Sequence, residues 1–514
     1  MTTIQSPDGT PAMVDVLVIG GGINGAGIAA DAATRGLSVM LAEAEDLAGA
    51  TSSASSKLIH GGLRYLEQWA FRLVREALAE REVLLSKAPH IIWPMRFVLP
   101  HVAGMRSKLT LRAGLFLYDH LAARPSLPGS SSVDLTTDPS GMALSPALTG
   151  GFSYWDCWVD DARLVVLNAM AARLAGATVL TRTPVTAMRV EAGVWHITVG
   201  TGASERHVTA KSVVNAGGPW VGRIAGLTLG ARNAPPPSVR LVKGSHIVVP
   251  RIAGADDALI LQHPDGRVIF ALPIEQAFTL IGTTDESYSG DPREAAISTA
   301  EIDYLLAIAN RFLRQPLTRD DIVWQFSGVR PLDDDGSERA SAVSRDYRLE
   351  RDDAGGAPVV HVIGGKITTY RRLAEQAVDL LQPTFPSMLP CATAKAVLPG
   401  GDVGGKGHPA ENFAAWFAAF SARHTGFDSA ALLRLARRYG TRADIILGGA
   451  RTTADLGTDF GAGLSAREVG YLKAHEWAMT AEDVLWRRTK TALHLSSTER
   501  VRAAEAIDAA LPGL

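Results

Sequence analysis

Short apolar runs, most of them followed closely by glycine, recur along much of the chain. Residues 15–19 (DVLVI) and 37–42 (LSVMLA) consist mainly of β-branched and aliphatic side chains, as do strands that are buried on both faces of a parallel sheet. The alanine-rich stretch 24–35 between them predicts a helix. Two later runs, 212–216 and 359–363, repeat the pattern of strand and glycine turn. The pattern therefore predicts one parallel sheet whose strands come from distant parts of the sequence.

The pattern changes between residues 236 and 340, and again after Pro390. In the first of these regions the runs SHIVVP, VIFALP and TLIGTTD predict the strands of an antiparallel sheet. The glycine-rich segment 398–405 has the composition of a linker, and Ala, Leu and Arg then recur at helical spacing in residues 406–514. We therefore expect a second sheet in the middle of the chain and a helical domain at its C-terminal end.

Length and composition narrow the class of protein. A chain of 514 residues with 46% hydrophobic and 20% charged residues is expected to fold into two or three globular domains. Its formal net charge of −2 gives no general attraction to nucleic acid. Cys157 and Cys391 lie far apart in the sequence, which argues against a metal site or a disulfide and fits a reducing, intracellular compartment. We expect no signal peptide, and no apolar run is long enough for a spanning helix.

The first strand leads into a glycine motif of the type that binds dinucleotides. Gly20, Gly22 and Gly25 satisfy G-x-G-x-x-G, and the strand after the following helix ends in Glu43. Gly20 permits a tight turn, Gly22 allows a pyrophosphate close to the backbone, and Gly25 lets the helix pack against the strand. The helix N-terminus offers N–H groups to the phosphates, and Glu43 can accept hydrogen bonds from a ribose. The motif predicts dinucleotide binding but does not separate FAD from NAD.

Three later segments favour FAD. The serine-rich stretch 50–67 (ATSSASSKLIHGGLRYLE) offers small side chains against which a flat ring can lie, and 212–220 (SVVNAGGPW) returns the chain to the nucleotide. At 359–370 (VVHVIGGKITTY), a helix start would place a positive dipole end near the flavin, which gains negative charge on reduction. Besides the glycine motif and Glu43, the residues expected to contact FAD are Thr51, Ser52, Ser56, Gly61, Gly62, Gly217, Gly365, Lys366, Ile367 and Thr368.

Long stretches of the chain closely resemble the aerobic, membrane-associated glycerol-3-phosphate dehydrogenase family. The matching blocks are DVLVIGGGINGAGIAADAATRGLSVML, ATSSASSKLIHGGLRYLE, DCWVDDARLV, VVNAGGPW, LVKGSHIVVPR, IGTTDESYSGDP, RDDIVWQFSGVRPL and GGKITTYRRLAE, within residues 14–376. Gly217 departs from the alanine or threonine that the family more often carries, but it keeps a small residue beside the cofactor. The resemblance implies oxidation of sn-glycerol 3-phosphate to dihydroxyacetone phosphate by hydride transfer to FAD, with electrons passed on to membrane quinone.

Pattern and resemblance together predict an α/β protein with three parts. These are a discontinuous Rossmann-like FAD-binding domain, an antiparallel-sheet substrate domain and a C-terminal helical cap domain. The expected boundaries are 14–90, 150–235 and 341–390 for the FAD-binding domain, 236–340 for the substrate domain, 406–514 for the helical domain, and 91–149 for a helical segment that is a candidate for membrane contact.

Oxidation of a phosphorylated polyol needs cations for the phosphate and a base for the hydroxyl proton. Arg330, in SGVRP, is the first candidate to bind the substrate, because its planar guanidinium can donate hydrogen bonds to a phosphate or to a developing alkoxide. Arg64 and Tyr65, in HGGLRYL, and Lys366, after the glycine pair, are further candidates for substrate binding. The alternative for each cation is a solvated side chain or a structural ion pair.

The proton acceptor has two candidates. His246 begins an apolar strand of the substrate domain, and the resemblance suggests that it lies near the flavin face; the alternative is a structural histidine at a strand edge. His60 is the rival candidate. The segment 283–285 (TTD), at the end of another strand, is expected to support the site rather than take part in the chemistry.

Residues 105–124 (MRSKLTLRAGLFLYDHLAAR) combine leucine and phenylalanine with arginine and lysine. A basic amphipathic helix can lie in the interface of a bilayer, although a core helix with a solvated face has the same composition. The resemblance favours membrane contact and hence a cytoplasmic protein on the inner face of the cell membrane. A homodimer is a further possibility that the sequence leaves open.

Other functions are compatible with a flavin fold. An amine or 2-hydroxy-acid oxidase would bind a carboxylate, and the extra cations Arg64, Arg330 and Lys366 argue against it. A flavoprotein without catalytic function would need no such cations. No residue in the sequence decides between quinone and oxygen as the electron acceptor, and neither a metal nor nucleic acid is expected.

Overall fold

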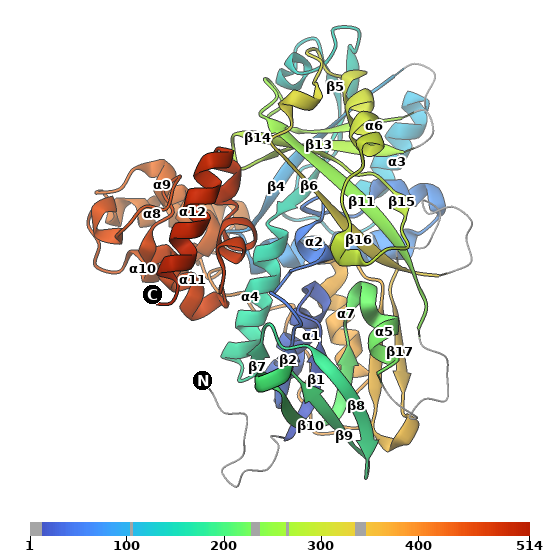
Figure 1. Cartoon of the computed structure of the whole chain (residues 1–514). Coiled ribbons are helices and arrows are strands. Elements are labelled where there is room, and N and C mark those ends of the chain that lie inside the picture. The colour runs from blue at the N-terminus through green and yellow to red at the C-terminus, as the bar shows by residue number, and fades with distance from the viewer. Residues whose placement is uncertain (1–12, 103–105, 228–236, 264–266, 335–345) are drawn as a thin grey trace.

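The computed structural model describes residues 13–102, 106–227, 237–263, 267–334 and 346–514 (Figure 1). Residues 1–12, where no signal peptide is expected, and Met105 of the amphipathic segment lie outside the described residues. Within the described ranges, no helix combines the length and the apolar composition that crossing a membrane requires.

The first sheet carries the glycine motif. Its strands run in the order β17-β18-β10-β1-β2-β7, and β9 joins β8 to β10. The pairs β1–β10, β1–β2, β10–β18 and β2–β7 are parallel. The strands are β1 Met13–Ile19, β2 Val39–Ala42, β7 Thr178–Leu180, β8 Val185–Glu191, β9 Val194–Val199, β10 Arg206–Asn215, β17 Arg348–Asp352 and β18 Val359–Ile363.

Helices cover this sheet, and α1 is made largely of small residues. α1 (Ile23–Thr34) packs against α4 (Asp161–Leu174) and α7 (Tyr370–Asp379), and it is buried over most of its length. At Gly27 of α1, a Cβ atom would lie 2.7 Å from the ring of Tyr370, so glycine allows the helices to approach closely. A short helix, α5 (Val221–Ala225), follows β10.

The second sheet has ten strands in the order β15-β11-β14-β13-β12-β4-β6-β3, with β16 beside β11 and β5 beside β6. Only β12–β4, among the pairs in the described residues, is parallel. The strands are β3 Leu58–Ile59, β4 Ile92–Pro100, β5 Ser131–Asp134, β6 Gly150–Val159, β11 Val239–Pro250, β12 Ala258–Gln262, β13 Val268–Ile274, β14 Phe278–Gly282, β15 Glu286–Ser287 and β16 Trp324–Asp333.

Helices pack on both faces of the second sheet. α6 (Thr299–Asn310) shares a core with Ile247 of β11, whereas α2 (Phe71–Lys87) and α3 (Lys108–His120) share a core with the next residue, Val248. Since successive side chains of a strand point to opposite faces, these helices cover opposite sides of the sheet.

The structure differs from the expected boundaries between residues 91 and 159. β4 and β5 lie within the segment expected to be helical, β6 lies at the start of a segment expected in the FAD-binding domain, and all three belong to the second sheet. Pro94 and Arg96 interrupt the apolar pattern of β4, which hides the strand in the sequence. Its neighbours β6 and β12 are distant along the chain, so no local hairpin signal marks it either.

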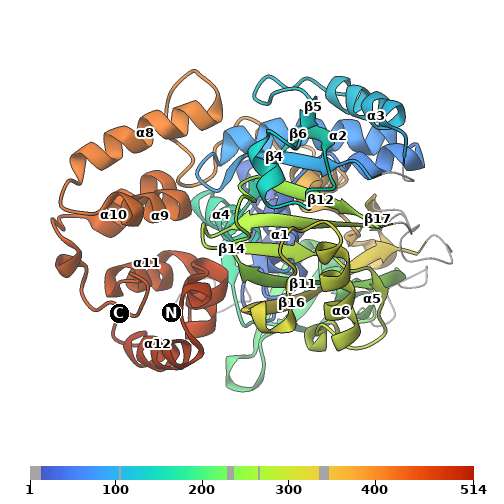
Figure 2. The same cartoon turned by 90° about the horizontal axis from the view of Figure 1, so that it is seen from above.

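The C-terminal helices form a domain with a core of its own, seen beside α4 in Figure 2. That core includes Phe420, Leu435, Leu472, Val484 and Ile507, which are all buried. The predicted arrangement of a discontinuous parallel sheet, an antiparallel sheet and a helical C-terminal domain is therefore confirmed. The helices are α8 Pro409–Arg423, α9 Ser429–Tyr439, α10 Ala443–Leu447, α11 Ala466–Glu476 and α12 Ser497–Ala510.

Candidate active site

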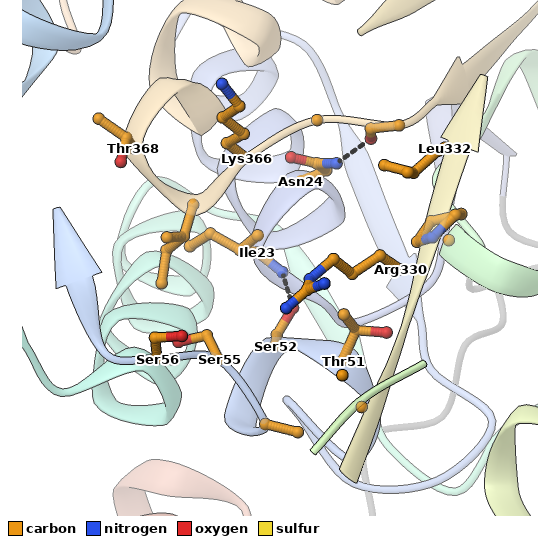
Figure 3. Close-up of a pocket in the computed structure, with 18 of the residues that line it drawn as sticks. Ile23, Asn24, Thr51, Ser52, Ser55, Ser56, Arg330, Leu332, Lys366 and Thr368 are labelled. Carbon is orange, nitrogen blue, oxygen red and sulfur yellow. Dashed lines mark hydrogen bonds between the residues drawn. The ribbon is translucent and has the colours of Figure 1, made fainter. Parts of the chain in front are cut away.

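A cavity of about 1060 Å³ lies where the two sheets meet. The glycine motif, the serine-rich loop (residues 50–56), β16 and the turn at residues 364–368 all contribute to its wall (Figure 3). Residues 216–220 line it as well, so the structure brings together the glycine motif and the three later segments that the sequence assigns to flavin binding.

The glycine motif forms a tight turn at the N-terminus of α1. Gly20 has φ +107°, and a Cβ atom there would lie 2.5 Å from the carbonyl oxygen of Ala216. The Ile23 N–H donates to the hydroxyl of Ser52 at 3.0 Å, and this bond ties the start of α1 to the serine-rich loop. No acidic residue occupies the first turn of α1, and the positive dipole end of the helix faces the cavity.

Glu43 lies at the end of β2, on the cavity wall. Its carboxylate accepts hydrogen bonds from the N–H groups of Gly21, at 2.5 Å, and Glu45, at 2.8 Å. Burial raises the pKa of Glu43 despite these bonds. The carboxylate is thus fixed against the glycine turn, at the edge of the cavity where the motif predicts a ribose.

The serine-rich loop is anchored on both sides. The Thr51 hydroxyl donates to the carbonyl of Val329 in β16 at 2.6 Å, and the Ser55 hydroxyl donates to Asp161 at 2.7 Å. Lys57, just after the loop, pairs with Asp161 at 2.7 Å, and both side chains are buried. The sequence analysis missed this pair. A signal for the acidic partner was the dipeptide Asp160-Asp161 at the start of α4, because aspartate is favoured at helix N-termini.

The turn at residues 364–368 closes the cavity on a third side. Gly364 and Gly365 have φ values of +76° and +103°, and Asn24 donates from Nδ2 to the Gly364 carbonyl at 3.1 Å. The Lys366 ammonium lies 3.7 Å from the centroid of the Tyr65 ring. Two of the predicted substrate-binding side chains therefore lie together, and Arg64 also lines the cavity.

Arg330 reaches the cavity from β16 and is held there by two side chains of the segment after β14. Its guanidinium pairs with Asp285 and donates to the Thr283 hydroxyl at 3.1 Å. A Cβ atom at position 244 would lie 2.5 Å from Nη2 of Arg330, so glycine there makes room for the guanidinium. The segment 283–285 thus supports Arg330, as expected, and also partly neutralises its charge.

The two candidate bases occupy different surroundings. Of the described residues that line the cavity, His60 is one and His246 is not. His246 is 1% exposed, shares a hydrogen bond of 2.9 Å with Ser56 through Nε2, and stacks on Phe326. Burial, with smaller effects of Arg330 and Lys57, holds its pKa well below the usual range. The geometry therefore favours a structural role for His246 and leaves His60 as the candidate base at the cavity.

The cavity continues beyond the charged residues toward α3. Leu111, Gly114 and Leu117 of α3 line this branch, together with Ile260 and Phe270 of the second sheet. These side chains are mostly apolar, whereas Arg64, Lys366 and Arg330 give other parts of the wall a positive charge. The cavity therefore has a polar part and an apolar branch, which the sequence analysis did not foresee.

The residues around the cavity fit a bound FAD. The glycine turn, the acid-free helix start and Glu43 provide the contacts that a dinucleotide requires. A Cβ atom at Gly22 would come within 3.1 Å of Ser52 Oγ, so the glycine keeps the backbone accessible. The turn at residues 364–368 lines the same cavity, where it can contact the flavin half of FAD. The fold and the site thus define a flavin-dependent oxidoreductase.

Comparisons with known proteins agree with this class. Residues 15–371 match the family described as FAD dependent oxidoreductase, and residues 391–511 match the C-terminal domain of alpha-glycerophosphate oxidase. The chain is 50% identical to a glycerol-3-phosphate dehydrogenase of Pseudomonas aeruginosa, covering 100% of this chain and 98% of that one. It is 49% identical to a D-erythritol 1-phosphate dehydrogenase of Brucella abortus, covering 97% and 98%.

A solved structure extends the agreement to three dimensions. The glycerol-3-phosphate dehydrogenase of Bacillus halodurans, complexed with FAD, aligns with a TM-score of 0.72 and 28% identity, covering 97% of this chain and 94% of that one. The chain belongs to the FAD-dependent oxidoreductase family. The predicted resemblance to the aerobic glycerol-3-phosphate dehydrogenases, the enzymatic nature of the protein and its FAD cofactor are therefore confirmed.

Proposed function

We propose that this enzyme oxidises sn-glycerol 3-phosphate to dihydroxyacetone phosphate. The observation that carries the proposal is that Arg64, Lys366 and Arg330 line the same cavity as the dinucleotide turn. A substrate with a phosphate group needs such cations, whereas a neutral polyol does not. The name of the Pseudomonas aeruginosa relative, matched over its whole length, gives independent support.

In the proposed reaction, FAD, when bound, would supply the acceptor for the hydride from C2 of the substrate. Arg64 and Lys366 hold the phosphate, and Tyr65 packs against the Lys366 ammonium and restricts its position. Arg330 faces the oxygen on C2, and its bonds to Asp285 and Thr283 fix its orientation before the substrate arrives. His60 accepts the hydroxyl proton, because of the two candidate histidines it is the one on the cavity wall.

The Brucella abortus relative gives a second candidate substrate, D-erythritol 1-phosphate. The two compounds share a phosphate and a neighbouring secondary alcohol, so the same cations suit both. Dye-coupled turnover with each compound, and with glycerol and glycine as controls, distinguishes the two candidates. We expect the highest kcat/KM for glycerol 3-phosphate. A higher value for D-erythritol 1-phosphate would assign the enzyme to the longer substrate, and turnover of glycine alone would contradict phosphate recognition.

We further propose that the protein binds the inner face of the cell membrane through α3 and passes electrons to membrane quinone. Leu109 and Phe116 of α3 are 80% and 61% exposed, and Lys108 and Arg112 lie on the same helix. This combination suits the interface of an anionic bilayer. The apolar branch of the cavity reaches α3, which supports an acceptor that enters from the lipid. A homodimer stays a prediction.

Flotation with vesicles that contain anionic lipid tests the membrane proposal. Phe116→Ser should reduce the bound fraction, because it removes an exposed apolar side chain from α3. Val501→Ser is the matched control, since Val501 is 58% exposed but lies in the C-terminal domain. Equal binding of both variants and the unaltered protein would contradict docking through α3.

A further inference from the structure

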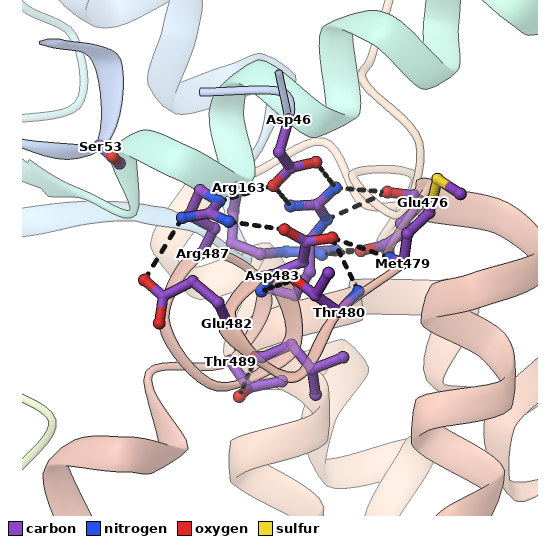
Figure 4. Close-up of polar contacts among 12 residues, drawn as sticks. Asp46, Ser53, Arg163, Glu476, Met479, Thr480, Glu482, Asp483, Arg487 and Thr489 are labelled. Atoms are coloured by element: carbon purple, nitrogen blue, oxygen red, sulfur yellow. Dashed lines mark hydrogen bonds and ion pairs between the residues drawn. The ribbon is translucent and has the colours of Figure 1, made fainter. Parts of the chain in front are cut away.

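The boundary between the C-terminal domain and the FAD-binding domain is crossed by buried ion pairs (Figure 4). One of them joins Arg488 to Asp46. Arg488 donates from Nη1 and Nη2 to the two carboxylate oxygens of Asp46 at 2.7 and 2.8 Å. The two side chains are 0% and 4% exposed. This paired geometry fixes the direction as well as the distance of the contact.

Arg488 is itself held in place by its own domain. It donates from Nε and Nη2 to the backbone carbonyl of Glu476 at 3.0 and 2.7 Å. The Glu476 carboxylate pairs with Arg163 of α4, so the end of α11 is tied to the FAD-binding domain beside this contact. The guanidinium of Arg488 therefore has little freedom to move, and it presents a fixed anchor to Asp46.

Asp46 belongs to a segment that wraps around the glycine turn. Glu43 accepts a hydrogen bond from the Gly21 N–H, and the Ala48 N–H donates to the Gly21 carbonyl at 3.1 Å. Between them Leu47 is fully buried, with its Cδ2 atom 3.0 Å from the place where a Cβ of Gly21 would lie. A displacement of Asp46 would therefore be passed on directly to the backbone that contacts the dinucleotide.

Packing alone does not hold this segment on its outer side. A second cavity of about 400 Å³ is lined by Glu45, by residues 49–51 and 53–54, and by Trp486, Arg487 and Lys490 of the C-terminal domain, so it adjoins the segment on both sides of residues 46–48. Without close packing there, polar contacts determine where the segment sits. Arg487 adds one such contact, a hydrogen bond from Nε to Asp46 at 2.6 Å.

We propose that Arg488 is a positioning residue for the FAD site, and that the C-terminal domain sets the affinity for FAD through the contact between Arg488 and Asp46. The proposal rests on FAD binding, not on the identity of the substrate. Arg488 touches neither the main cavity nor the reacting groups, so its effect is on binding of the cofactor and not on the chemical step.

The test compares two contacts across the same domain boundary. Arg488→Lys keeps the charge but loses the paired geometry, and Asp46→Asn removes the carboxylate. Arg437→Lys is the control, because Arg437 of α9 crosses the same boundary with a hydrogen bond from Nη1 to the Pro89 carbonyl at 3.2 Å, and this bond involves neither Arg488 nor the segment around the glycine turn. The dissociation constant of FAD is measured by titrating flavin into the full-length apoprotein, and thermal unfolding of each apoprotein reports its stability.

We expect Arg488→Lys and Asp46→Asn to raise the dissociation constant of FAD at least tenfold, with kcat and KM near those of the unaltered enzyme at saturating FAD. Arg437→Lys should lower the unfolding temperature but change the dissociation constant less than twofold. An unchanged constant in the first two variants, or an equal rise in all three, would overturn the proposal. If Arg488→Lys does not fold, Arg487→Ala decides: a rise of about threefold supports the proposal, and no change contradicts it.

Discussion

Gly25→Ala is expected to weaken FAD binding about a hundredfold, because Gly25 is where α1 crosses closest to the glycine turn. A Cβ atom at this position would lie 1.9 Å from the carbonyl oxygen of Gly20. Ordinary contact begins at 3.4 Å, so the helix and the turn would have to separate by about 1.5 Å (3.4 minus 1.9). The oxygen belongs to the backbone and the Cβ is bonded directly to it, so no side-chain rotation can relieve the clash.

The magnitude follows from the hydrogen bonds that such a shift would break. A hydrogen bond to a charged group contributes about 1.5–3 kcal/mol. A displacement of about 1.5 Å would remove one or two backbone bonds to the pyrophosphate, at a cost of about 3 kcal/mol. Since about 1.4 kcal/mol corresponds to a factor of ten in affinity, the dissociation constant of FAD should rise about a hundredfold.

Flavin titration of the apoprotein measures this effect, with Gly217→Ala as the matched control. A Cβ atom at position 217 would meet Cδ1 of Ile224 at 2.1 Å, but that atom is the end of a flexible side chain that can turn away. Gly217→Ala should therefore change the constant less than threefold. Equal effects of the two substitutions, or no effect of Gly25→Ala, would refute the assignment of the glycine turn to the pyrophosphate.

Two further predictions concern buried charges, and a third concerns the catalytic base. Lys57→Met should lower the free energy of unfolding by about 3 kcal/mol, since it leaves the Asp161 carboxylate buried without its cation, as urea denaturation would measure. Burial opposes ionisation of Asp483, but hydrogen bonds and two arginines outweigh it and lower its pKa from 3.8 to about 2. The stability that this provides, roughly 2 kcal/mol, is present above pH 3.8 and lost as the pH falls through 2, so Asp483→Asn should flatten the acid-unfolding curve. His60→Gln should lower kcat at least a hundredfold, whereas His246→Gln should mainly lower stability.

Each of these predictions can fail independently. A loss below about 1 kcal/mol for Lys57→Met would show that the pair contributes little to stability. An acid-unfolding curve that is unchanged by Asp483→Asn would contradict its lowered pKa. A larger loss of kcat from His246→Gln than from His60→Gln, in folded protein, would return the role of base to His246.

The sequence predicted the elements whose signals are local. The first strand, the glycine turn and Glu43 follow one another within one unit, and each has a composition that its role demands. The same holds for the turn at residues 364–368, where two glycines adopt positive φ values. These positions could be predicted because backbone geometry restricts which residues can occupy them.

Features that depend on distant contacts were not predicted. β4 was missed because both its neighbours, β6 and β12, come from other parts of the chain. The burial of His246 results from its packing against Phe326 and Gly282, which the apolar run around it does not reveal. The ion pair between Arg330 and Asp285 likewise joins β16 to the distant segment between β14 and β15, and its effect on the charge of Arg330 needed the structure.

Anaerobic reduction of the bound flavin tests the central claim most directly. The purified enzyme is mixed with sn-glycerol 3-phosphate without oxygen, and in parallel with D-erythritol 1-phosphate, glycerol, glycine and 2-hydroxyglutarate, while the flavin absorption band is recorded. We expect rapid bleaching of the flavin band by glycerol 3-phosphate and none by the compounds that lack a phosphate. Bleaching by glycine or 2-hydroxyglutarate, with none by glycerol 3-phosphate, would contradict it.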